Sequence, residues 1–399
     1  MTNRFTELLE SRDVLLADGA TGTNLFAMGL QSGDAPELWN TDKPENIKAL
    51  YQGFIDAGSD MFLTNTFGGT AARLKLHDAQ SRVGELNRVG AELGREVVDK
   101  MDRTVIVAGS VGPTGEIMQP VGELSHALAV EMFHEQADAL KEGGVDIIWL
   151  ETISAPEEFS AAVEAFKLAD MPWCGTMSFD TAGRTMMGVT SHQMAKLVTD
   201  YENAPLAFGA NCGTGPADML RTVLGFASQD TGIPIISKGN AGIPKYVDGK
   251  IYYDGNPELM GEYAVMARDA GAKVIGGCCG TMPDHLLKMR EMLDSTPRGE
   301  APSLPAVVSA MGDFSSESDG TEDSGCCGGC GGGEEKPARG RRGRRRGWAR
   351  TNTAKRGRLC GPVFVRTGPV DPLPAAGAQK GRCAGVWFFP ATPNACRQV

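Results

Sequence analysis

The sequence lacks the features that would place it in a membrane or in an oxidising compartment. No run of eighteen apolar residues occurs among its 399 residues, and residues 1–7 do not combine a positive segment with an apolar stretch. Histidine is scarce: the chain has five, and all fall in helix-like or loop-like segments where a solvated surface position is the simplest interpretation. We therefore expect a soluble, cytoplasmic protein without a membrane partner, and we assign no histidine to a metal.

Acidic residues are nearly absent from the last part of the chain. Residues 337–399 carry 14 Lys and Arg but a single acid, Asp371, which leaves 49 acids and 25 bases in residues 1–336. Helical and strand periodicity also ends near Thr296, and an acidic Ser-rich stretch, a Cys/Gly run and an Arg/Gly run follow. We therefore expect three parts: a folded domain at 1–296, an acidic, Gly/Cys-rich linker at 297–336, and a basic low-complexity tail at 337–399.

The tail is expected to be disordered, because its composition cannot bury a core. The abrupt change after Lys336 also motivates the hypothesis that the tail is a frameshift product, which mass spectrometry of the purified C-terminus would test. Cysteine follows the same division, with four residues before position 300 and six beyond position 325. Without an export signal, a disulfide framework is not expected. Whether Cys326, Cys327 and Cys330 bind a metal is left open.

Eight short apolar runs, each ended by Gly, Pro or Asn, alternate with segments of helical spacing in the first 280 residues. Leu86, Val89, Leu93 and Val97, for example, follow a helical period with charged residues on the other faces. Alternating strands and helices predict parallel pairing through crossover helices. Eight such units fit an α/β fold of the (β/α)8 TIM-barrel type, with a doubly wound open sheet as the alternative. The predicted strands are Val14–Ala17, Met61–Thr66, Val105–Ser110, Asp146–Glu151, Trp173–Phe179, Leu206–Asn211, Pro234–Lys238 and Lys273–Gly276.

Polar residues stand at the ends of these predicted strands. In a TIM barrel, the carboxyl ends of the strands and the loops that follow them build the active site, so these side chains are expected to converge. They are Asp18, Asn65, Glu151, Asp180, Cys212, Asn240, Cys278 and Cys279.

Three of the cysteines suit a metal. Three thiolates can hold one zinc ion and leave its fourth tetrahedral position open, as catalytic sites do. Two adjacent cysteines can share one ion only where the backbone leaves regular strand geometry, which the glycines around Cys278 and Cys279 permit. Such a site suits alkyl transfer to a thiol, because the metal deprotonates the thiol near neutral pH. Buried cysteine is also a common apolar filler; we expect Cys174 to fill the core, and spacing alone leaves Cys212, Cys278 and Cys279 undecided.

Further motifs extend this pattern along the chain. Asp18-Gly19-Ala20-Thr21-Gly22-Thr23, Thr64-Asn65-Thr66-Phe67-Gly68, Gly112-Pro113-Thr114-Gly115-Glu116, Glu151-Thr152, Gly209-Ala210-Asn211-Cys212 and Gly276-Gly277-Cys278-Cys279-Gly280-Thr281 occur in this order. Together they resemble the homocysteine S-methyltransferase family, which includes betaine–homocysteine methyltransferases and the homocysteine-binding module of cobalamin-dependent methionine synthase. The resemblance covers about residues 10 to 295.

This resemblance implies zinc on Cys212, Cys278 and Cys279, which are then the catalytic residues. It also implies an amino-acid clamp for homocysteine made by Asp18, Glu151 and the backbone of Ala20 and Thr21. The assignment agrees with elementary chemistry, because backbone N–H groups in a Gly-rich turn can hold a carboxylate and an acid can hold an ammonium. Asn65 and Asn240 are weaker substrate-binding candidates, since asparagines at such positions often close turns.

The methyl donor is the least determined part of the prediction. The resemblance implies betaine as the leading donor, giving methionine and dimethylglycine. A methylcobalamin protein, which would make this chain the homocysteine-methylating subunit of a split methionine synthase, and S-methylmethionine are the alternatives. Gly68 stands where animal betaine enzymes carry a tyrosine that helps enclose the quaternary ammonium, so one wall of a cation–π cage is missing. Trp39, Tyr51 and Trp149 are candidates to replace that wall.

Two other classes of function remain as alternatives. Clustered arginines between Arg339 and Arg358 could bind RNA phosphates, although the acidic domain makes a nucleic-acid partner the weaker interpretation. A zinc-dependent aldolase or lyase on the same barrel is disfavoured, because all-sulfur ligation suits thiols better than enolates. The oligomeric state is undetermined, with a homo-oligomer as one option.

Overall fold

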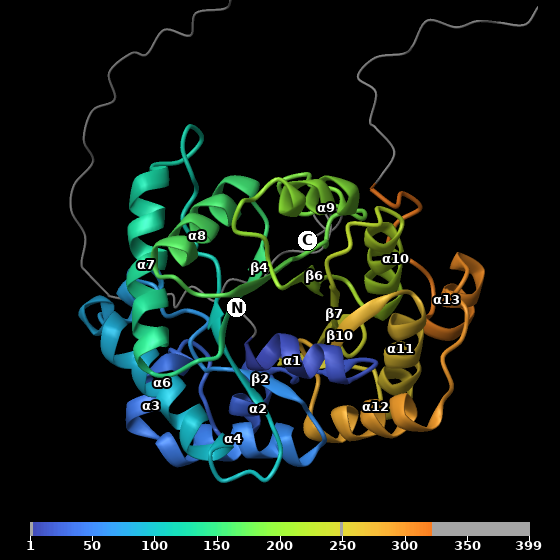
Figure 1. The fold of residues 1–399 in the computed structure, drawn as a ribbon, viewed down its shortest axis with the longest axis horizontal. Coiled ribbons are helices and arrows are strands. Elements are labelled where there is room, and N and C mark those ends of the chain that lie inside the picture. Colours follow the sequence, from blue (N-terminus) through green and yellow to red (C-terminus); the bar gives the residue numbers. More distant parts are fainter. Residues whose placement is uncertain (1–2, 248–249, 321–399) are drawn as a thin grey trace, which may run out of the picture. The chain divides into compact units, whose positions relative to one another are not determined.

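Eight parallel strands form one sheet that curls into a nearly closed barrel (Figure 1). The computed structural model describes residues 3–247 and 250–320 of the chain. Each of the eight predicted runs overlaps one barrel strand, so the predicted (β/α)8 barrel is confirmed and the open doubly wound sheet is excluded. In sequence order these strands are β1 (Leu15–Leu16), β2 (Met61–Leu63), β3 (Ile106–Val111), β4 (Ile147–Ile153), β5 (Trp173–Met177), β6 (Ala207–Cys212), β7 (Ile235–Gly239) and β10 (Ala272–Gly277).

A ring of helices surrounds the barrel, one main helix after each strand. Several begin with proline in their first turn, where the missing N–H costs nothing, and α9 begins with a capping box between Thr190 and Gln193. The ring contains α4 (Pro44–Asp56), α6 (Val83–Val98), α7 (His126–Glu142), α8 (Pro156–Leu168), α9 (Ser191–Thr199), α10 (Pro216–Ala227), α11 (Pro257–Asp269) and α12 (Pro283–Ser295). Shorter helices are α1 (Arg4–Ser11), α2 (Thr21–Ala27), α3 (Trp39–Asp42), α5 (Ala71–Leu74) and α13 (Leu304–Met311).

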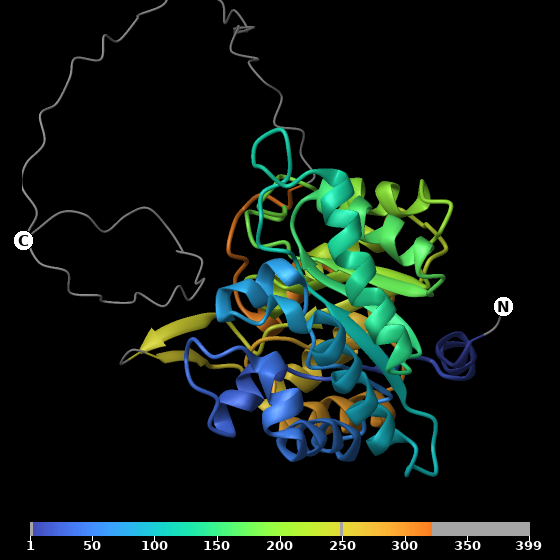
Figure 2. The ribbon, with the colours of Figure 1, turned by 90° about the vertical axis from the view of Figure 1, so that its left-hand side faces the viewer.

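The core has two layers. Side chains between strands and helices make the larger one, and a smaller cluster fills the barrel interior with residues such as Leu15, Trp149 and Ile236. Cys174 belongs to this inner cluster and is fully buried, as expected of an apolar filler. Phe5 and Leu8 of α1 complete the inner cluster, so this helix closes the amino-terminal end of the barrel (Figure 2).

The barrel is joined differently where β1 meets β2. These strands stand at the two ends of the sheet order and share no regular ladder. At the amino-terminal end, Asp60 N–H donates to the Leu16 carbonyl (2.7 Å) and the Asp60 carboxylate accepts from Leu16 N–H (2.8 Å). At the carboxyl-terminal end, the Asp18 carboxylate accepts from Leu63 N–H (2.9 Å). Two buried carboxylates thus replace ladder hydrogen bonds along this seam.

Three elements lie outside the predicted pattern. The hairpin of β8 (Pro244–Val247) and β9 (Lys250–Tyr253) follows β7 and projects from the carboxyl-terminal end of the barrel (Figure 2). The helix α1 precedes the barrel. Beyond residue 296, where periodicity predicted no regular element, α13 packs against α10 and α11 and buries Val307. No helix among the described residues is both long and apolar enough to cross a bilayer.

Several sequence-based expectations lie outside the described residues. These are the basic tail at 337–399, residues 321–336 of the acidic linker, the open question about Cys326, Cys327 and Cys330, and the arginine cluster considered for RNA.

Candidate metal centre and substrate pocket

The three candidate cysteines meet at the carboxyl-terminal end of the barrel. Cys212 is the last residue of β6, and Cys278 and Cys279 directly follow β10. Their sulfur atoms all lie within 4.8 Å of one another, and Cys212 Sγ is 3.9 Å from Cys279 Sγ. Zinc–sulfur bonds of about 2.3 Å at tetrahedral angles separate two sulfurs by about 3.8 Å. The three thiols therefore fit one zinc ion with little movement.

Unusual backbone geometry brings these sulfurs together. Cys212 has a φ of +63°, in the left-handed region that non-glycine residues rarely occupy. Gly277 precedes the cysteine pair, and a Cβ atom there would overlap the side chain of Thr281. Cys278 N–H still donates to the Gly239 carbonyl of β7 (2.8 Å), so the pair is anchored to the sheet as it leaves strand geometry. Such strain tends to cluster at functional sites.

Two asparagines tie the cysteine loops to each other and to the barrel. Asn240 donates to the Gly213 carbonyl (2.8 Å) and accepts from Cys279 N–H (3.0 Å), which links the loops after β6 and β10. Asn211 is fully buried and directs its amide N–H toward Cys278 Sγ (3.8 Å). The same amide bonds Thr152, whose backbone also has a positive φ of +62°. One asparagine thus fixes a sulfur and the end of β4 together.

The projecting hairpin adds a tyrosine to the site. Tyr253, the last residue of β9, lies beside Cys279, and its hydroxyl favours the thiolate form of that cysteine. Its ring lies against Gly280, where a Cβ would overlap the aromatic carbons. Burial, together with the neighbouring thiolate charge, raises the pKa of Tyr253. The neutral hydroxyl is therefore a hydrogen-bond donor to sulfur near neutral pH.

The cysteine thiols of the cluster differ in their pKa values. Hydrogen bonds from Cys212 and Cys278, with a further one from Tyr253, lower the pKa of Cys279 well below that of an ordinary thiol. The same contacts raise the pKa of Cys212, because ionising it would place a second negative charge beside the first. A divalent cation would remove this repulsion, which is the electrostatic reason why such a cluster attracts metal.

A layer of buried charges lies in the barrel beside the sulfurs. Lys238 of β7 donates to the Asp18 carboxylate, and their side chains are 2% and 1% exposed. Glu151 of β4 is partly exposed and accepts from Ser110 Oγ at 2.5 Å. Burial raises the pKa of Glu151 to about 7, and the charges of Asp18 and Cys278 add to this effect while Lys238 opposes it. This layer therefore holds two acids and one base.

The remaining predicted substrate residues have contacts of several kinds. Ala20 N–H donates to the Thr281 carbonyl (3.1 Å), so this group is already used, whereas Thr21 begins α2 and its N–H has no acceptor within that helix. The amide nitrogen of Asn65 donates to the Pro36 carbonyl (2.8 Å) and to Asn40 Oδ1 (2.9 Å). Asn65 and Asn240 thus link loops through their side-chain amides, and both stay weaker candidates for the substrate clamp than Glu151.

Sequence reasoning did not single out Asn211, Lys238 or Tyr253 as site residues. Asn211 directly precedes Cys212, and Lys238 is a charged residue ending an otherwise apolar strand, Ile235-Ile236-Ser237-Lys238. A lysine in such a run is a signal for an internal ion pair, because an unpaired buried charge is costly. Tyr253 carried no comparable signal, since the hairpin itself was not predicted.

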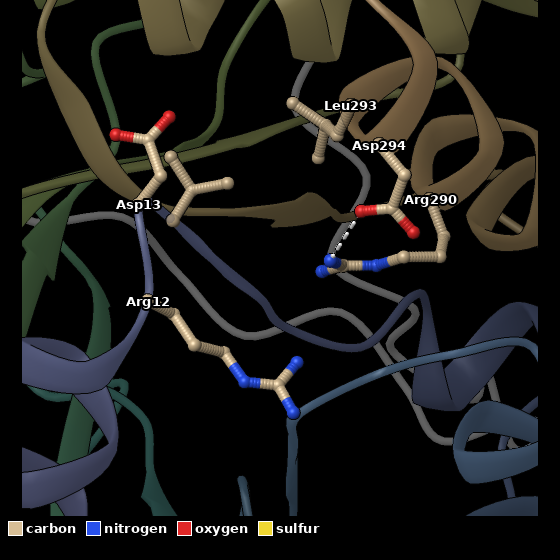
Figure 3. A pocket seen from close by; sticks show the side chains of 6 residues that line it. Arg12, Asp13, Arg290, Leu293 and Asp294 are labelled. Atoms are coloured by element: carbon tan, nitrogen blue, oxygen red, sulfur yellow. Dashed lines mark hydrogen bonds and ion pairs between the residues drawn. The ribbon is translucent and has the colours of Figure 1, made fainter.

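A hollow lies at the amino-terminal end of the barrel, away from the cysteines (Figure 3). It has a volume of about 310 Å³ and is lined by Arg12, Asp13, Val14, Arg290, Leu293 and Asp294. Its charged groups are already paired: Arg12 with Asp60 (2.5 Å), Arg290 with Asp294 (3.1 Å) and Asp13 with Arg298 (3.0 Å). This charge balance gives an ionic ligand no particular reason to bind there.

The fold and the sulfur cluster define a (β/α)8 barrel with a three-cysteine candidate metal centre at its catalytic end. Comparison with known proteins agrees with that class: the profile described as homocysteine S-methyltransferase matches residues 15–293. The chain therefore belongs to the homocysteine S-methyltransferase family.

Similar proteins fall into two groups. Methionine synthases of Mycobacterium tuberculosis and Mycobacterium leprae are each 29% identical to this chain, over 77% of it and 27% of their own length. The chain thus spans about a quarter of the length of these relatives. Crystal structures of the Escherichia coli homocysteine methyltransferase MmuM share the fold. The oxidised form gives a TM-score of 0.61 at 24% identity, covering 73% of this chain and 99% of that one. The metallated form gives 0.61 at 22% identity, covering 72% and 99%.

Proposed function

We propose that this protein binds one zinc ion through Cys212, Cys278 and Cys279 and transfers a methyl group to the thiol of homocysteine, giving methionine. The observation that carries the proposal is the meeting of three sulfurs within 4.8 Å at the catalytic end of the barrel. Membership of the family and the existence of a metallated form of MmuM support it. When bound, zinc would lower the pKa of an incoming thiol so that it reacts as a thiolate near neutral pH.

The protein's own residues then orient the substrate. Glu151 beside the sulfurs suits the substrate ammonium, and the Thr21 N–H at the start of α2 suits its carboxylate. Asn211 directs its amide at Cys278 and Tyr253 lies beside Cys279, so both residues help to fix the cysteine sulfurs. The methyl group passes directly from donor to substrate sulfur, with the thiol proton released to solvent and no covalent enzyme intermediate. Orientation therefore supplies much of the rate.

Betaine is our first proposal for the donor: a sulfur–methyl bond forms as a nitrogen–methyl bond breaks, leaving dimethylglycine. The three aromatic residues considered as replacements for the cation–π cage do not favour betaine as the donor. Trp39, Tyr51 and Trp149 are 6%, 0% and 0% exposed, so all three belong to the core. Beside Gly68, a Cβ would lie 2.9 Å from the Glu37 carboxylate, so an acid rather than an aromatic ring fills this space. An acid can attract a cationic donor without making a cation–π cage.

A methylcobalamin protein is the second donor candidate. The observation that favours it is the similarity to the two mycobacterial methionine synthases. S-methylmethionine is a third option, because an acid beside Gly68 would also attract a sulfonium.

The function is tested by incubating zinc-loaded protein with homocysteine and one donor at a time: betaine, methylcobalamin or S-methylmethionine. Methionine formation with at least one donor, lost after metal removal and restored by zinc, is the expected result. The donor that gives the highest kcat/KM identifies the methyl donor that the enzyme prefers. Equal activity in metal-free and zinc-loaded protein would contradict the role given to the three cysteines.

A further inference from the structure

The resemblance implied that Asp18 and Glu151 together hold the substrate ammonium, but the structure gives Asp18 other partners. One carboxylate oxygen accepts from Leu63 N–H (2.9 Å) and so closes the seam between β1 and β2. The other accepts from the Lys238 ammonium. With a side chain 1% exposed and both oxygens hydrogen-bonded, the Asp18 carboxylate is closed off from a ligand that enters from solvent.

Lys238 is held in place as firmly as its partner. Its side chain is 2% exposed, and its ammonium lies 5.7 Å from the centre of the Trp149 ring in addition to its bond with Asp18. A buried ammonium without a counter-ion would be very costly, so the pair is a fixed part of the barrel. Although burial alone lowers the pKa of Lys238, Asp18 and Glu151 raise it more, and the side chain stays charged.

Glu151 differs from Asp18 in the same layer. It is partly exposed, and among the described residues its carboxylate accepts a hydrogen bond from Ser110, a neutral hydroxyl. Lys238 influences it through space but donates its hydrogen bond to Asp18. The layer contains two carboxylates and one ammonium, so the negative charge of Glu151 is not balanced by a cation of the protein. A substrate ammonium would balance it.

We propose that Lys238 determines substrate specificity by permanently occupying the cation position of Asp18, so that Glu151 alone receives the ammonium of the thiol substrate. The inference deepens the proposed homocysteine methylation and rests on it. Lys238 is a positioning residue that acts through Asp18 and Glu151. The substrate class that fits is a thiol bearing one ammonium group, and a thiol without an ammonium should bind poorly.

The test compares two thiols that differ only in the amino group, homocysteine and 4-mercaptobutanoate, by calorimetric titration of zinc-loaded protein in the absence of donor. Wild-type protein should bind homocysteine about 10- to 100-fold more tightly, the range expected for a charged hydrogen bond. The matched variants are Glu151→Gln and the Asp18→Asn/Lys238→Met double variant, which removes the ion pair and leaves the charge of Glu151 unchanged. Glu151→Gln should reduce the preference to about onefold, while the double variant should keep it within about threefold of wild type.

A second measurement, made on metal-free protein, tests the ion pair itself. Lys238→Met leaves the buried Asp18 carboxylate without its cation, whereas the Asp18→Asn/Lys238→Met double variant removes both charges of the pair. The double variant should therefore melt at a higher temperature than Lys238→Met.

Different results would refute the proposed function and the role of Lys238. Wild-type protein that binds neither thiol would refute the proposed function. The role of Lys238 alone would be overturned if wild type bound both thiols with equal affinity, if the preference survived Glu151→Gln, or if it were lost in the double variant. A double variant less stable than Lys238→Met would also contradict the fixed ion pair.

Discussion

Asp60 and Asp18 are buried carboxylates that do the same structural work at opposite ends of the β1–β2 seam, yet their surroundings differ. Asp60 accepts from Leu16 N–H and is surrounded by three guanidinium groups, those of Arg12 (2.5 Å), Arg290 (3.0 Å) and Arg103 (3.8 Å). Asp18 accepts from Leu63 N–H and has one cation, Lys238, with Glu151 close enough to repel it.

The difference separates stability from binding. At the amino-terminal end, the buried acid has several cationic partners, so it offers no unpaired negative charge to a ligand. At the carboxyl-terminal end, acids outnumber the base, and three thiols add further capacity for positive charge. In barrels of this type the carboxyl-terminal face carries the chemistry and the other face contributes stability. Asp60 and Asp18 occupy corresponding places in the β1–β2 seam, and the difference in the charges around them follows this division between stability and chemistry.

The largest expected effect is on the sulfur cluster. Cys278→Ala should reduce bound zinc from one equivalent to nearly none and lower methyl transfer by at least about 1000-fold, because two thiolates leave the tetrahedral site incomplete. Metal analysis and a methionine assay measure both changes. Cys174→Ala is the matched control, since that buried cysteine lies in the inner core away from the cluster, and it should keep full zinc content. Stoichiometric zinc in Cys278→Ala would contradict the assigned ligands.

At the amino-terminal end of the barrel, removal of the Asp60 charge should lower the stability of the fold without changing substrate preference. Asp60→Asn leaves three guanidinium groups without their shared acid and should lower the free energy of unfolding by about 3 kcal/mol. Denaturant titration measures this loss. The control Asp294→Asn removes an exposed partner of Arg290 and should cost under about 1 kcal/mol. Asp60→Asn should leave the preference for homocysteine over 4-mercaptobutanoate unchanged; loss of that preference would break the proposed separation of the two ends.

A smaller effect is expected where a neutral residue orients a sulfur. Asn211→Ala removes the amide that points at Cys278 and should weaken zinc binding about 10- to 100-fold, as loss of groups that orient metal ligands commonly does. Competition with a chromophoric chelator measures the affinity. Asn256→Ala, which removes the cap of α11 without touching a ligand, should leave zinc affinity unchanged. Equal affinities in the two variants would show that Asn211 does not support the metal.

The smallest expected effect is the pH dependence that Glu151 contributes to the stability of the metal-free protein. Burial raises its pKa from 4.5 to about 7 in the folded state. Below pH 4.5 both folded and unfolded chains hold the proton, and as pH rises through 7 the folded chain loses stability because its carboxylate is poorly solvated. Glu151→Gln should therefore match wild type near pH 4.5 and exceed it by roughly 1–3 kcal/mol at pH 8. A difference that does not vary with pH would contradict this assignment.

The barrel and the sulfur cluster could be predicted because both depend on local patterns. Short apolar runs ended by glycine or asparagine mark each strand, and parallel strands bring their carboxyl ends to one face whatever the details of packing. Cys212 and the Cys278-Cys279 pair could therefore be expected to meet. Cys174 could be placed in the core for the same reason, since it lies within a strand rather than at its end.

The charge pairing could not be predicted because it depends on which side chains face one another across the barrel. Asp18 and Lys238 are 220 residues apart in sequence, and the resemblance assigned Asp18 to substrate without accounting for a lysine at this place. The β8–β9 hairpin was missed because its eight strand residues fall in a segment of mixed polarity after β7. Its tyrosine was missed with it. The helix α13 is too short for periodicity to reveal, and it is stabilised by packing on α10 and α11.

The most direct test of the central claim is X-ray absorption at the zinc edge, recorded with and without homocysteine. The account predicts three sulfur ligands at about 2.3 Å and one lighter ligand in the protein alone, changing to four sulfur ligands when homocysteine is added. Fewer than three sulfurs in the protein alone, or a sulfur count that homocysteine does not change, would contradict it.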